Sequence, residues 1–600
     1  MAQEVNGSSN QCDPARRRRK RGIFFFVIAL AGLASCSVGA LWLRQTRLAQ
    51  LRTDIPPVPA AVPTPSLREL LENARTQAVA GEFSPLAEFG MLCHANGFFR
   101  EAELCWRLLI RHRPNEARWH YYLAVLLRTA GDNVAAEKEL QLVVAADPTA
   151  APAWLQLAEM KFKSGRHVAA EHDYRRRLEL LPDDPYAELG LARIAQSRGR
   201  SDETLSRLER ILKNHPRFST AHNLYAELQA AVGREDLADQ HRWLGREAGR
   251  FREADDPWMM ELNARCHEPT RLCHLGVVAF QTGTGDLGRA QFERAIAVAP
   301  AEPLGYQMLG ELLLNQGAFE ASRDVLTKGL AMAQGGAPKP MHYLKLSETC
   351  RALARHEDAW NAVQEGLTRH PDSAELYHEL GLQLTGRNRP TEASAAYRRA
   401  LQLNPAHAES DFALALILLE QGRREEAVQA LNHARQMQPT YPKALLLLAR
   451  LEMEAGQIES VGEYLLPLLK ANPGVLEIRQ ITARWRLQAG QAIEQRDPAA
   501  AERHYRTGLA LLPENPELNA ALGVRFLVTD RIAEAIPLLE TFQQARPADS
   551  QGALFLGQAY VRAGRLQDAR RVLSNGLQEA ERSGRTATAS HFREILSVIP

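Results

Sequence analysis

Apolar residues recur along most of the chain with the spacing of paired amphipathic helices. From about residue 83 to residue 583, segments with helical periodicity alternate with glycine-containing turns and end at prolines. The turn and stop residues return every 34 positions, as shown by Gly97, Gly131, Gly165 and Gly199 and by Pro114, Pro148, Pro182 and Pro216. This pattern predicts an all-α fold built from one repeated helix–turn–helix unit.

The repeated residues resemble the tetratricopeptide repeat (TPR) pattern W-x2-L-G-x2-Y…A-x3-F…P. The best match, residues 374–407, has Tyr377, Leu380, Gly381, Ala393, Tyr397, Ala400 and Pro405 in the positions of the pattern. In this frame the units begin at Phe83, Ala117, Ala151, Pro185, Ser219, Pro269, Pro303, Pro340, Ala374, Ala408, Pro442, Thr482, Pro516 and Ser550. The resemblance implies a TPR α-solenoid superhelix of about 14 repeats.

The repeat frame divides this part of the chain into blocks. We expect a capping helix over 67–82, started by Ser66, then five repeats over 83–252. A second block of nine repeats covers 269–583, and a C-terminal capping helix lies within 584–600. Short inserts at 337–339 and 476–481 interrupt the second block.

Residues 253–268 do not fit the frame and separate the two blocks. We interpret this insert as a hinge, a linker or an extra helix. Asp256 and Pro257 are suited to start such a helix, which would carry Trp258, Met259 and Leu262.

The N-terminal segment predicts a membrane anchor. Residues 1–21 form a basic tail, and the uncharged run 22–43 is long enough, at about 33 Å as a helix, to cross a bilayer core. The excess of basic residues before this transmembrane helix places the N-terminus in the cytoplasm and the repeats outside it, in the periplasm of a bacterium. Residues 44–66 form a juxtamembrane, proline-rich linker. A cleaved signal peptide remains an alternative, as does a lipoprotein anchored at Cys36.

Charge and motifs argue against catalysis and against nucleic-acid binding. The net charge is +2, and nine basic and two acidic residues lie within positions 1–52, so the remainder is mildly acidic. No P-loop, zinc-protease, serine-hydrolase or Cys-x-x-Cys motif occurs, and Gly283–Gly288 matches G-x-G-x-x-G only where the repeat frame places a turn. We therefore expect no enzyme activity, no cofactor and no metal.

The cysteines leave two minor alternatives open. Cys266-His267 and Cys273-His274 could together offer zinc ligands, although their spacing matches no common zinc finger. Cys93 and Cys105 lie on the two helices of one unit, where a disulfide is conceivable outside the cytoplasm. The simpler interpretation is that these cysteines are free, buried thiols.

The resemblance also implies where a partner binds, because the first helices of TPR units line a concave face. A chaperone-type carboxylate clamp is not expected, since the required lysine and asparagine positions hold other residues. Two candidate surfaces remain: an aromatic one near the N-terminus, and a more apolar one in the later units that packing between repeats could equally explain. The candidate residues are Tyr121, Tyr122, Phe162, Phe412, Leu416, Leu446, Leu447, Arg450, Leu554 and Phe555.

These observations predict a non-catalytic, single-pass membrane scaffold that binds a peptide or helix of a protein partner in its concave groove. Such a scaffold would serve envelope assembly, secretion or export. An envelope protein that holds a small ligand or lipid in the apolar groove is the alternative. Regulation of a partner enzyme and self-association of the solenoid also remain open.

Overall fold

The computed structural model describes residues 53–80, 83–251, 253–333 and 338–599. The predicted basic tail, the transmembrane run 22–43 and Cys36 lie outside these residues. Within the described residues, no helix is both long enough and apolar enough to cross a bilayer.

The described chain is all α-helical and contains no strand. It divides into two compact units, one made of residues up to 207 together with 252–305, and the other of residues 208–251 together with 306–600. Two of the three divisions fall inside helices, α10 (Ser201–Asn214) and α16 (Pro303–Asn315), and the third falls between α12 (Glu235–Glu247) and α13 (Pro257–Asn263). We call these two parts the first unit and the second unit.

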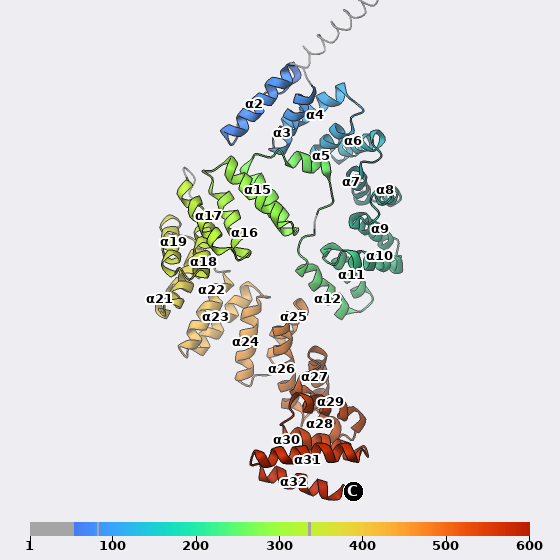
Figure 1. Cartoon of the computed structure of the whole chain (residues 1–600), viewed down its shortest axis with the longest axis vertical. Helices are drawn as coiled ribbons and strands as arrows, with labels where there is room; N and C mark the ends of the chain where they lie inside the picture. The colour runs from blue at the N-terminus through green and yellow to red at the C-terminus, as the bar shows by residue number, and fades with distance from the viewer. Residues whose placement is uncertain (1–52, 81–82, 252, 334–337, 600) are drawn as a thin grey trace, which may run out of the picture. The chain divides into compact units, whose positions relative to one another are not determined.

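The helices of the first unit come from two stretches of sequence (Figure 1). They are α2 (Pro65–Val79), α3 (Phe83–Ala95), α4 (Phe99–His112), α5 (Ala117–Thr129), α6 (Asn133–Ala146), α7 (Ala151–Lys163), α8 (His167–Leu180), α9 (Pro185–Ser197), α13 (Pro257–Asn263), α14 (Pro269–Gln281) and α15 (Gly285–Val298).

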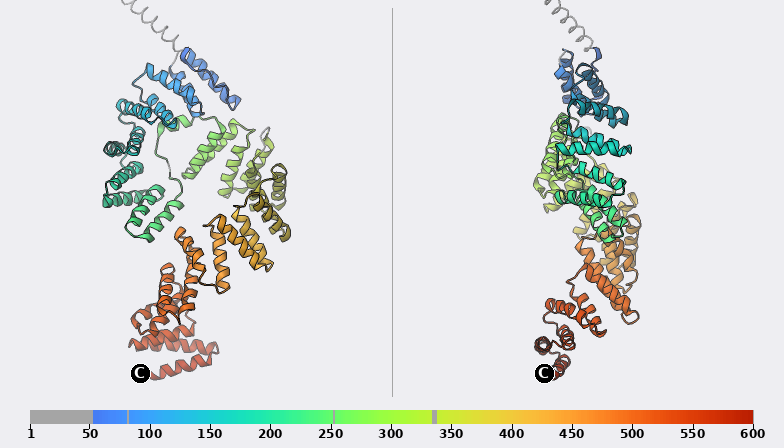
Figure 2. Two further views of the ribbon diagram at one scale, coloured as in Figure 1. Left: turned by 180° about the vertical axis from the view of Figure 1, so that it is seen from behind. Right: turned by 90° about the vertical axis from the view of Figure 1, so that its right-hand side faces the viewer.

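The second unit holds the remaining helices (Figure 2). They are α11 (Ser219–Ala231), α12 (Glu235–Glu247), α17 (Phe319–Met332), α18 (Pro340–Ala352), α19 (His356–Arg369), α20 (Ala374–Gly386), α21 (Pro390–Leu403), α22 (Ala408–Glu420), α23 (Arg424–Met437), α24 (Pro442–Glu454), α25 (Val461–Ala471), α26 (Leu476–Ile493), α27 (Pro498–Leu511), α28 (Pro516–Val528), α29 (Ile532–Ala545), α30 (Ser550–Arg562), α31 (Leu566–Arg582) and α32 (Thr586–Val598).

Consecutive helices pair because their facing residues alternate between small and large. In the first unit, a Cβ atom on Gly190 of α9 would lie 2.2 Å from the Tyr174 ring of α8. In the second unit, a Cβ on Gly381 of α20 would lie 2.4 Å from the Tyr397 ring of α21. The absence of a side chain at each glycine therefore lets a buried tyrosine fill the space between helices.

The predicted C-terminal capping helix is present as α32, and Phe592 on this helix is fully buried. The residues of the predicted insert 476–481 form the first turns of α26, which has 18 residues. Ile478 and Ile481 lie on the buried face of α26, so apolar periodicity extends the helix beyond the family frame.

The start of the N-terminal helix also differs from the prediction. Thr64, rather than Ser66, is its N-cap and accepts a hydrogen bond from the Leu67 amide, since Pro65 is favoured at the first helical position. The preceding residues do not project as a free stalk. Ile55 is buried, and Arg75 donates a hydrogen bond to the Pro56 carbonyl at 2.8 Å.

Candidate peptide-binding face of the first unit

The insert between the two blocks packs against the first helices of the first two repeats. Asp256 caps helix α13 by accepting a hydrogen bond from the Met259 amide at 3.0 Å. α13 then lies against α3, and Figures 1 and 2 show it as a short green helix beside the blue N-terminal helices. Residues far apart in the sequence thus form one local structure.

Two tyrosines of α5 hold the start of the insert. The Tyr121 hydroxyl donates a hydrogen bond to the Asp256 carboxylate, and the Tyr121 ring meets the Trp258 ring edge-on with centroids 4.9 Å apart. The Tyr122 hydroxyl donates a hydrogen bond to the Trp258 carbonyl at 3.1 Å. One tyrosine therefore contacts a side chain of the insert, and the other contacts its backbone.

Ion pairs hold the middle of the insert. Arg118 of α5 lies 3.2 Å from Glu261. The Arg265 Nε atom lies 2.9 Å from both carboxylate oxygens of Glu88 on α3. Partly exposed pairs of this kind contribute little energy individually, but the alternation of charges fixes the position of the insert along the face.

The end of the insert is held through its backbone. The Asn96 amide donates a hydrogen bond to the Arg265 carbonyl at 3.0 Å and accepts one from the His267 amide at 2.6 Å. Asn96 is only 4% exposed. From the opposite side, Arg294 of α15 donates hydrogen bonds to the Ala264 and Cys266 carbonyls, at 2.9 and 2.7 Å. The backbone of residues 264–267 is thus bound much as a protein binds an extended peptide.

Burial sets the protonation states at this face. Tyr121 and Tyr122 are fully buried, and loss of solvent raises the pKa of both hydroxyls, so both remain neutral hydrogen-bond donors. Burial also raises the pKa of the Asp256 carboxyl, while the Tyr121 hydroxyl opposes this shift. We call the surface made by Glu88, Asn96, Arg118, Tyr121 and Tyr122 the insert-binding face.

The predicted partner-binding residues near the N-terminus are therefore only partly accessible to a partner. Tyr121 and Tyr122 lie beneath the chain's own insert rather than on a vacant surface. Phe162, on α7, is half-buried and stacks on His167 with ring centroids 5.2 Å apart. Their role in partner binding stays a prediction.

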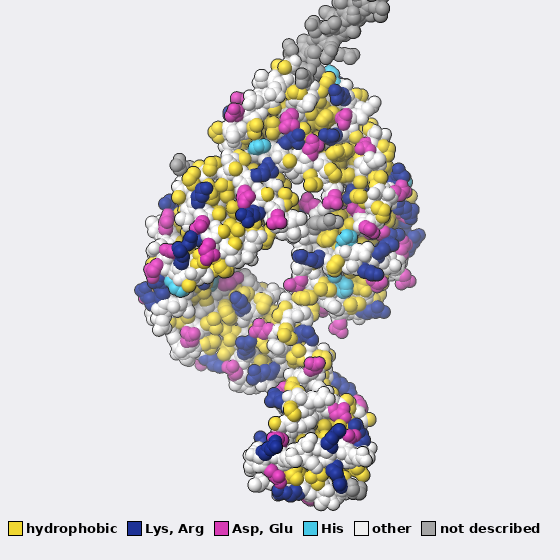
Figure 3. All heavy atoms as spheres, viewed as in Figure 1, with side chains coloured by type: hydrophobic (Ala, Val, Ile, Leu, Met, Phe, Trp, Pro, Cys, Tyr) yellow, Lys and Arg dark blue, Asp and Glu magenta, His cyan; other side chains and the backbone are white. Residues whose placement is uncertain are grey.

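The C-terminal candidates lie over two separate apolar cores of the second unit. Phe412 and Leu447 are half-buried and Leu446 is buried against the core of α22–α25, whereas Leu554 and Phe555 pack against the core of the final helices. The candidates therefore do not form one site. Leu416 is 41% exposed, and Figure 3 shows hydrophobic side chains gathered over α22–α24. Arg450 forms an ion pair with Glu477 at 2.7 Å.

Sequence reasoning missed most of the insert-binding face. Glu88, Arg118 and Glu261 are charged residues with no motif of their own. Glu88 and Arg118 do occupy groove-lining positions 6 and 2 of the repeat frame, so reading charge at those positions would have found them. Asn96 precedes a turn glycine, and nothing in the sequence distinguishes it from an ordinary helix-end residue.

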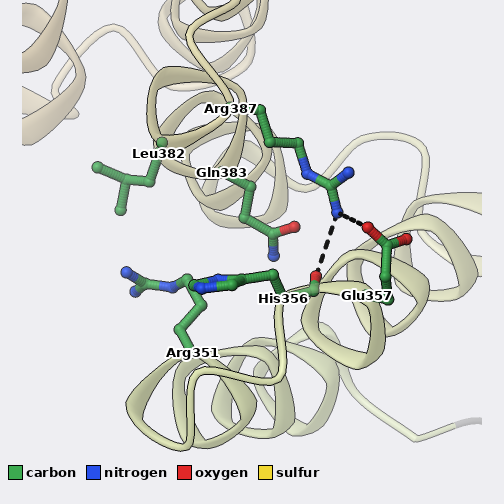
Figure 4. A pocket seen from close by; sticks show the side chains of 7 residues that line it. Arg351, His356, Glu357, Leu382, Gln383 and Arg387 are labelled. Atoms are coloured by element: carbon green, nitrogen blue, oxygen red, sulfur yellow. Dashed lines mark hydrogen bonds and ion pairs between the residues drawn. The ribbon is translucent and has the colours of Figure 1, made fainter.

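Sequence reasoning also missed a polar pocket of about 390 Å³ in the second unit, between α18–α19 and α20 (Figure 4). Arg387 donates a hydrogen bond to the His356 carbonyl at 3.2 Å and pairs with Glu357 at 3.0 Å. Arg351 is held by the buried Glu379 at 2.7 Å. The two arginines of the pocket therefore already have anionic partners.

No metal-binding cluster emerges within the described residues. They contain no group of three or more His, Cys, Asp or Glu side chains placed to hold a metal ion. His267 is hydrogen-bonded to the Arg265 carbonyl, and the Cys266 thiol contacts the Glu268 carbonyl. Cys93 and Cys105 are free and buried, and burial raises the pKa of both thiols.

Sequence comparison identifies the repeats. Two family profiles described as "Tetratricopeptide repeat" match the chain, one at residues 418–484 and the other at 95–151, 189–238, 378–442, 487–550 and 520–583. The chain belongs to the tetratricopeptide repeat family. The search of curated proteins found no match to this sequence.

Solved structures with similar folds share little sequence with this TPR protein. PilF of Pseudomonas aeruginosa is 19% identical over 36% of this chain and 97% of its own, with a TM-score of 0.31. YrrB, described as a TPR protein with an unusual peptide-binding site, is 16% identical over 32% and 97%, with a TM-score of 0.25. Yeast Tom70 is 15% identical over 75% and 96%, also with a TM-score of 0.25.

Proposed function

We propose that this TPR protein is a non-catalytic scaffold that binds a peptide or helix of a protein partner, anchored in a membrane by residues 22–43. The observation that carries the binding function is the insert-binding face. It holds an 11-residue stretch, Asp256 to Cys266, through side-chain contacts and through hydrogen bonds to its backbone. A surface that binds one peptide segment in this way has the chemistry needed to bind another.

The anchor and its orientation rest on the sequence alone. The uncharged run and the basic residues before it support a cytoplasmic N-terminus and repeats in the periplasm, where the scaffold would serve envelope assembly, secretion or export. Membrane fractionation tests the anchor. The intact chain should require detergent for extraction, and a chain without residues 22–43 should not. Retention of the shortened chain in the membrane would contradict the anchor.

In-cell crosslinking and capture test the scaffold role. The intact chain is compared with one lacking residues 408–583 and with one carrying the two changes Asn96→Ala and Arg118→Glu. A discrete protein that disappears with the deletion is bound by the apolar repeats, and one that disappears with the substitutions is bound by the insert-binding face. The scaffold role is wrong if the intact chain captures no partner at fixed stoichiometry.

A further inference from the structure

We propose that the insert is a built-in competitor. The face that holds it is a binding site for a partner segment of the same chemistry, which must displace the insert to bind. This inference rests on the proposed scaffold function and specifies its partner. The partner segment carries an acidic residue, an aromatic residue two positions later and a second acidic residue three positions after that, as in Asp256, Trp258 and Glu261.

The first argument is that the contacts between the face and the insert do not require the two to be close in the sequence. The residues paired across the face are separated in sequence by 135 to 177 positions. Three of the hydrogen bonds go to insert backbone groups, namely the Trp258 and Arg265 carbonyls and the His267 amide. Every peptide offers such groups, so the face can bind a segment of another chain with the same geometry.

The second argument is that helix α13 of the insert buries few apolar side chains. α13 has only seven residues, and Leu262 is its one fully buried side chain. Met260 on the same helix is 66% exposed. Residues 248–251 and 253–255, between α12 and Asp256, are not helical, and Gly249 lies in the left-handed region at φ +67°. A short segment with little apolar burial opens at lower free energy than the helix pairs beneath it.

The third argument is the charge pattern, which specifies the partner. Arg118 requires an acidic residue at the position of Glu261, and Glu88 requires a basic residue one helical turn later, at the position of Arg265. The Tyr121 hydroxyl requires an acceptor at the position of Asp256, and its ring requires an aromatic group nearby. A basic or purely aliphatic segment would leave these groups unpaired.

A peptide-binding assay tests the competition directly. The probe is a fluorescein-labelled peptide with the sequence of residues 254–268 and Cys266→Ser, titrated with the purified full-length chain and followed by anisotropy. Asp256→Ala and Trp258→Ala in the chain weaken the insert but leave the face intact. We expect them to tighten peptide binding at least tenfold, because a larger fraction of the face becomes vacant. Met260→Ala, an exposed change on the same helix, is the matched control and should bind as the unmodified chain does.

Changes in the face provide the second arm. In the chain with Trp258→Ala, the additional change Asn96→Ala removes two backbone hydrogen bonds and should weaken the peptide at least tenfold. Arg118→Glu should weaken it similarly, and a peptide carrying Glu261→Arg should recover the loss. Such rescue by opposite charge does not arise from general damage to the fold.

A third test uses the unmodified chain, so its result does not depend on whether a substituted chain folds. Hydrogen exchange at the α13 amides of residues 258–263 is measured with and without saturating peptide. We expect the peptide to accelerate exchange there, because it releases the insert. Unchanged exchange, or no tightening in the folded Trp258→Ala chain, overturns the proposal. If the competition fails this test but the intact chain still captures a partner in cells, the scaffold function stands. If the intact chain captures no partner, the scaffold function is rejected separately.

Discussion

The early repeats of the first unit and the later repeats of the second use the same helix pairs but present different surfaces. At frame positions 5 and 6, α5 carries Tyr121 and Tyr122, whose hydroxyls hold a polar segment. At position 5, α22 and α24 carry Phe412 and Leu446, which pack against an apolar core. The position in the repeat thus determines where the side chain lies. Whether that side chain can hold a polar segment depends on whether it carries a hydroxyl group.

The same contrast continues below the surface. In the repeat that begins at Ala151, position 27 is the buried Arg177, which pairs with Asp184 at position 34 at 2.7 Å. In the repeat that begins at Ala408, these positions are Ala434 and Tyr441, an apolar and an aromatic residue. The repeat that begins at Ala151 therefore has a buried ion pair at a place where the repeat that begins at Ala408 has an apolar and an aromatic residue.

The largest expected effect comes from breaking that ion pair. Asp184→Ala leaves the Arg177 charge buried and also removes the N-cap contact with the Ala187 amide. We expect a loss of about 3–5 kcal/mol in the free energy of unfolding. Urea denaturation measures it, and hydrogen exchange should locate the loss in the first unit. A loss below about 1 kcal/mol would mean that the Arg177–Asp184 pair is not the main difference between the interiors of the two repeats.

The next largest loss of stability is expected from adding a methyl group at a helix-packing glycine, and it should be equal in both units. Gly190→Ala and Gly381→Ala each force a Cβ atom into a tyrosine ring and should cost about 1–3 kcal/mol. Gly386→Ala, on the same helix as Gly381 and with open space around it, is the control and should be neutral or stabilising. Unequal losses at Gly190 and Gly381, measured by thermal unfolding, would show that the two units do not share one packing rule.

A smaller effect depends on pH and should also appear in both units. Burial lowers the pKa of His94 in the first unit to about 3 and that of His378 in the second to about 4, from an ordinary value of 6.5. Because unfolding lets each imidazole take up a proton, stability is full above pH 6.5 and declines as pH falls toward these values. We expect a loss of about 1 kcal/mol per histidine between pH 6.5 and 5.5.

Substitution identifies the histidine responsible. His378→Phe should flatten the decline between pH 6.5 and 4 for the second unit only, and His94→Phe should do so for the first unit only. The measurement is hydrogen exchange of each unit, corrected for the intrinsic pH dependence of exchange. An unchanged pH dependence in both variants would place the acid sensitivity elsewhere.

The smallest effect on stability is expected at the apolar surface of the second unit. Leu416 is exposed, so Leu416→Ser should change the free energy of unfolding by less than about 0.5 kcal/mol. If this surface binds a partner, the same change should still reduce capture in cells. A large loss of stability would instead show that the residue packs within the solenoid.

The fold was largely predictable because the repeat is encoded locally. Helices begin at Ala117, Ala151 and Ala374, at the positions where the family frame starts a repeat. Each of these starts lies between a proline and an apolar stripe. The frame set residues 476–481 aside as an insert, and an apolar stripe there extends α26 ahead of the repeat start at Thr482. Periodicity therefore predicts the length of this helix better than the family frame does.

The candidate site was predictable only in part. Tyr121 and Tyr122 were predicted to bind a partner, which stays a prediction, and their contacts with the insert were not foreseen. The insert reaches them through contacts across more than 130 positions, and a single sequence carries no signal for pairs so far apart. Asn96 was missed for the same reason, since its role depends on the backbone of residues 265–267.

The long sequence separation of the insert and its binding face matters during synthesis of the chain. Repeat proteins normally fold as neighbours emerge, because each repeat contacts only the adjacent ones. Tyr122, however, meets its partner Trp258 only after 136 further residues. At 5–20 residues per second this interval is roughly 7–27 s. Throughout that time the insert has not yet been made and cannot cover the face, so a partner present where the chain emerges would reach the face before the competitor does.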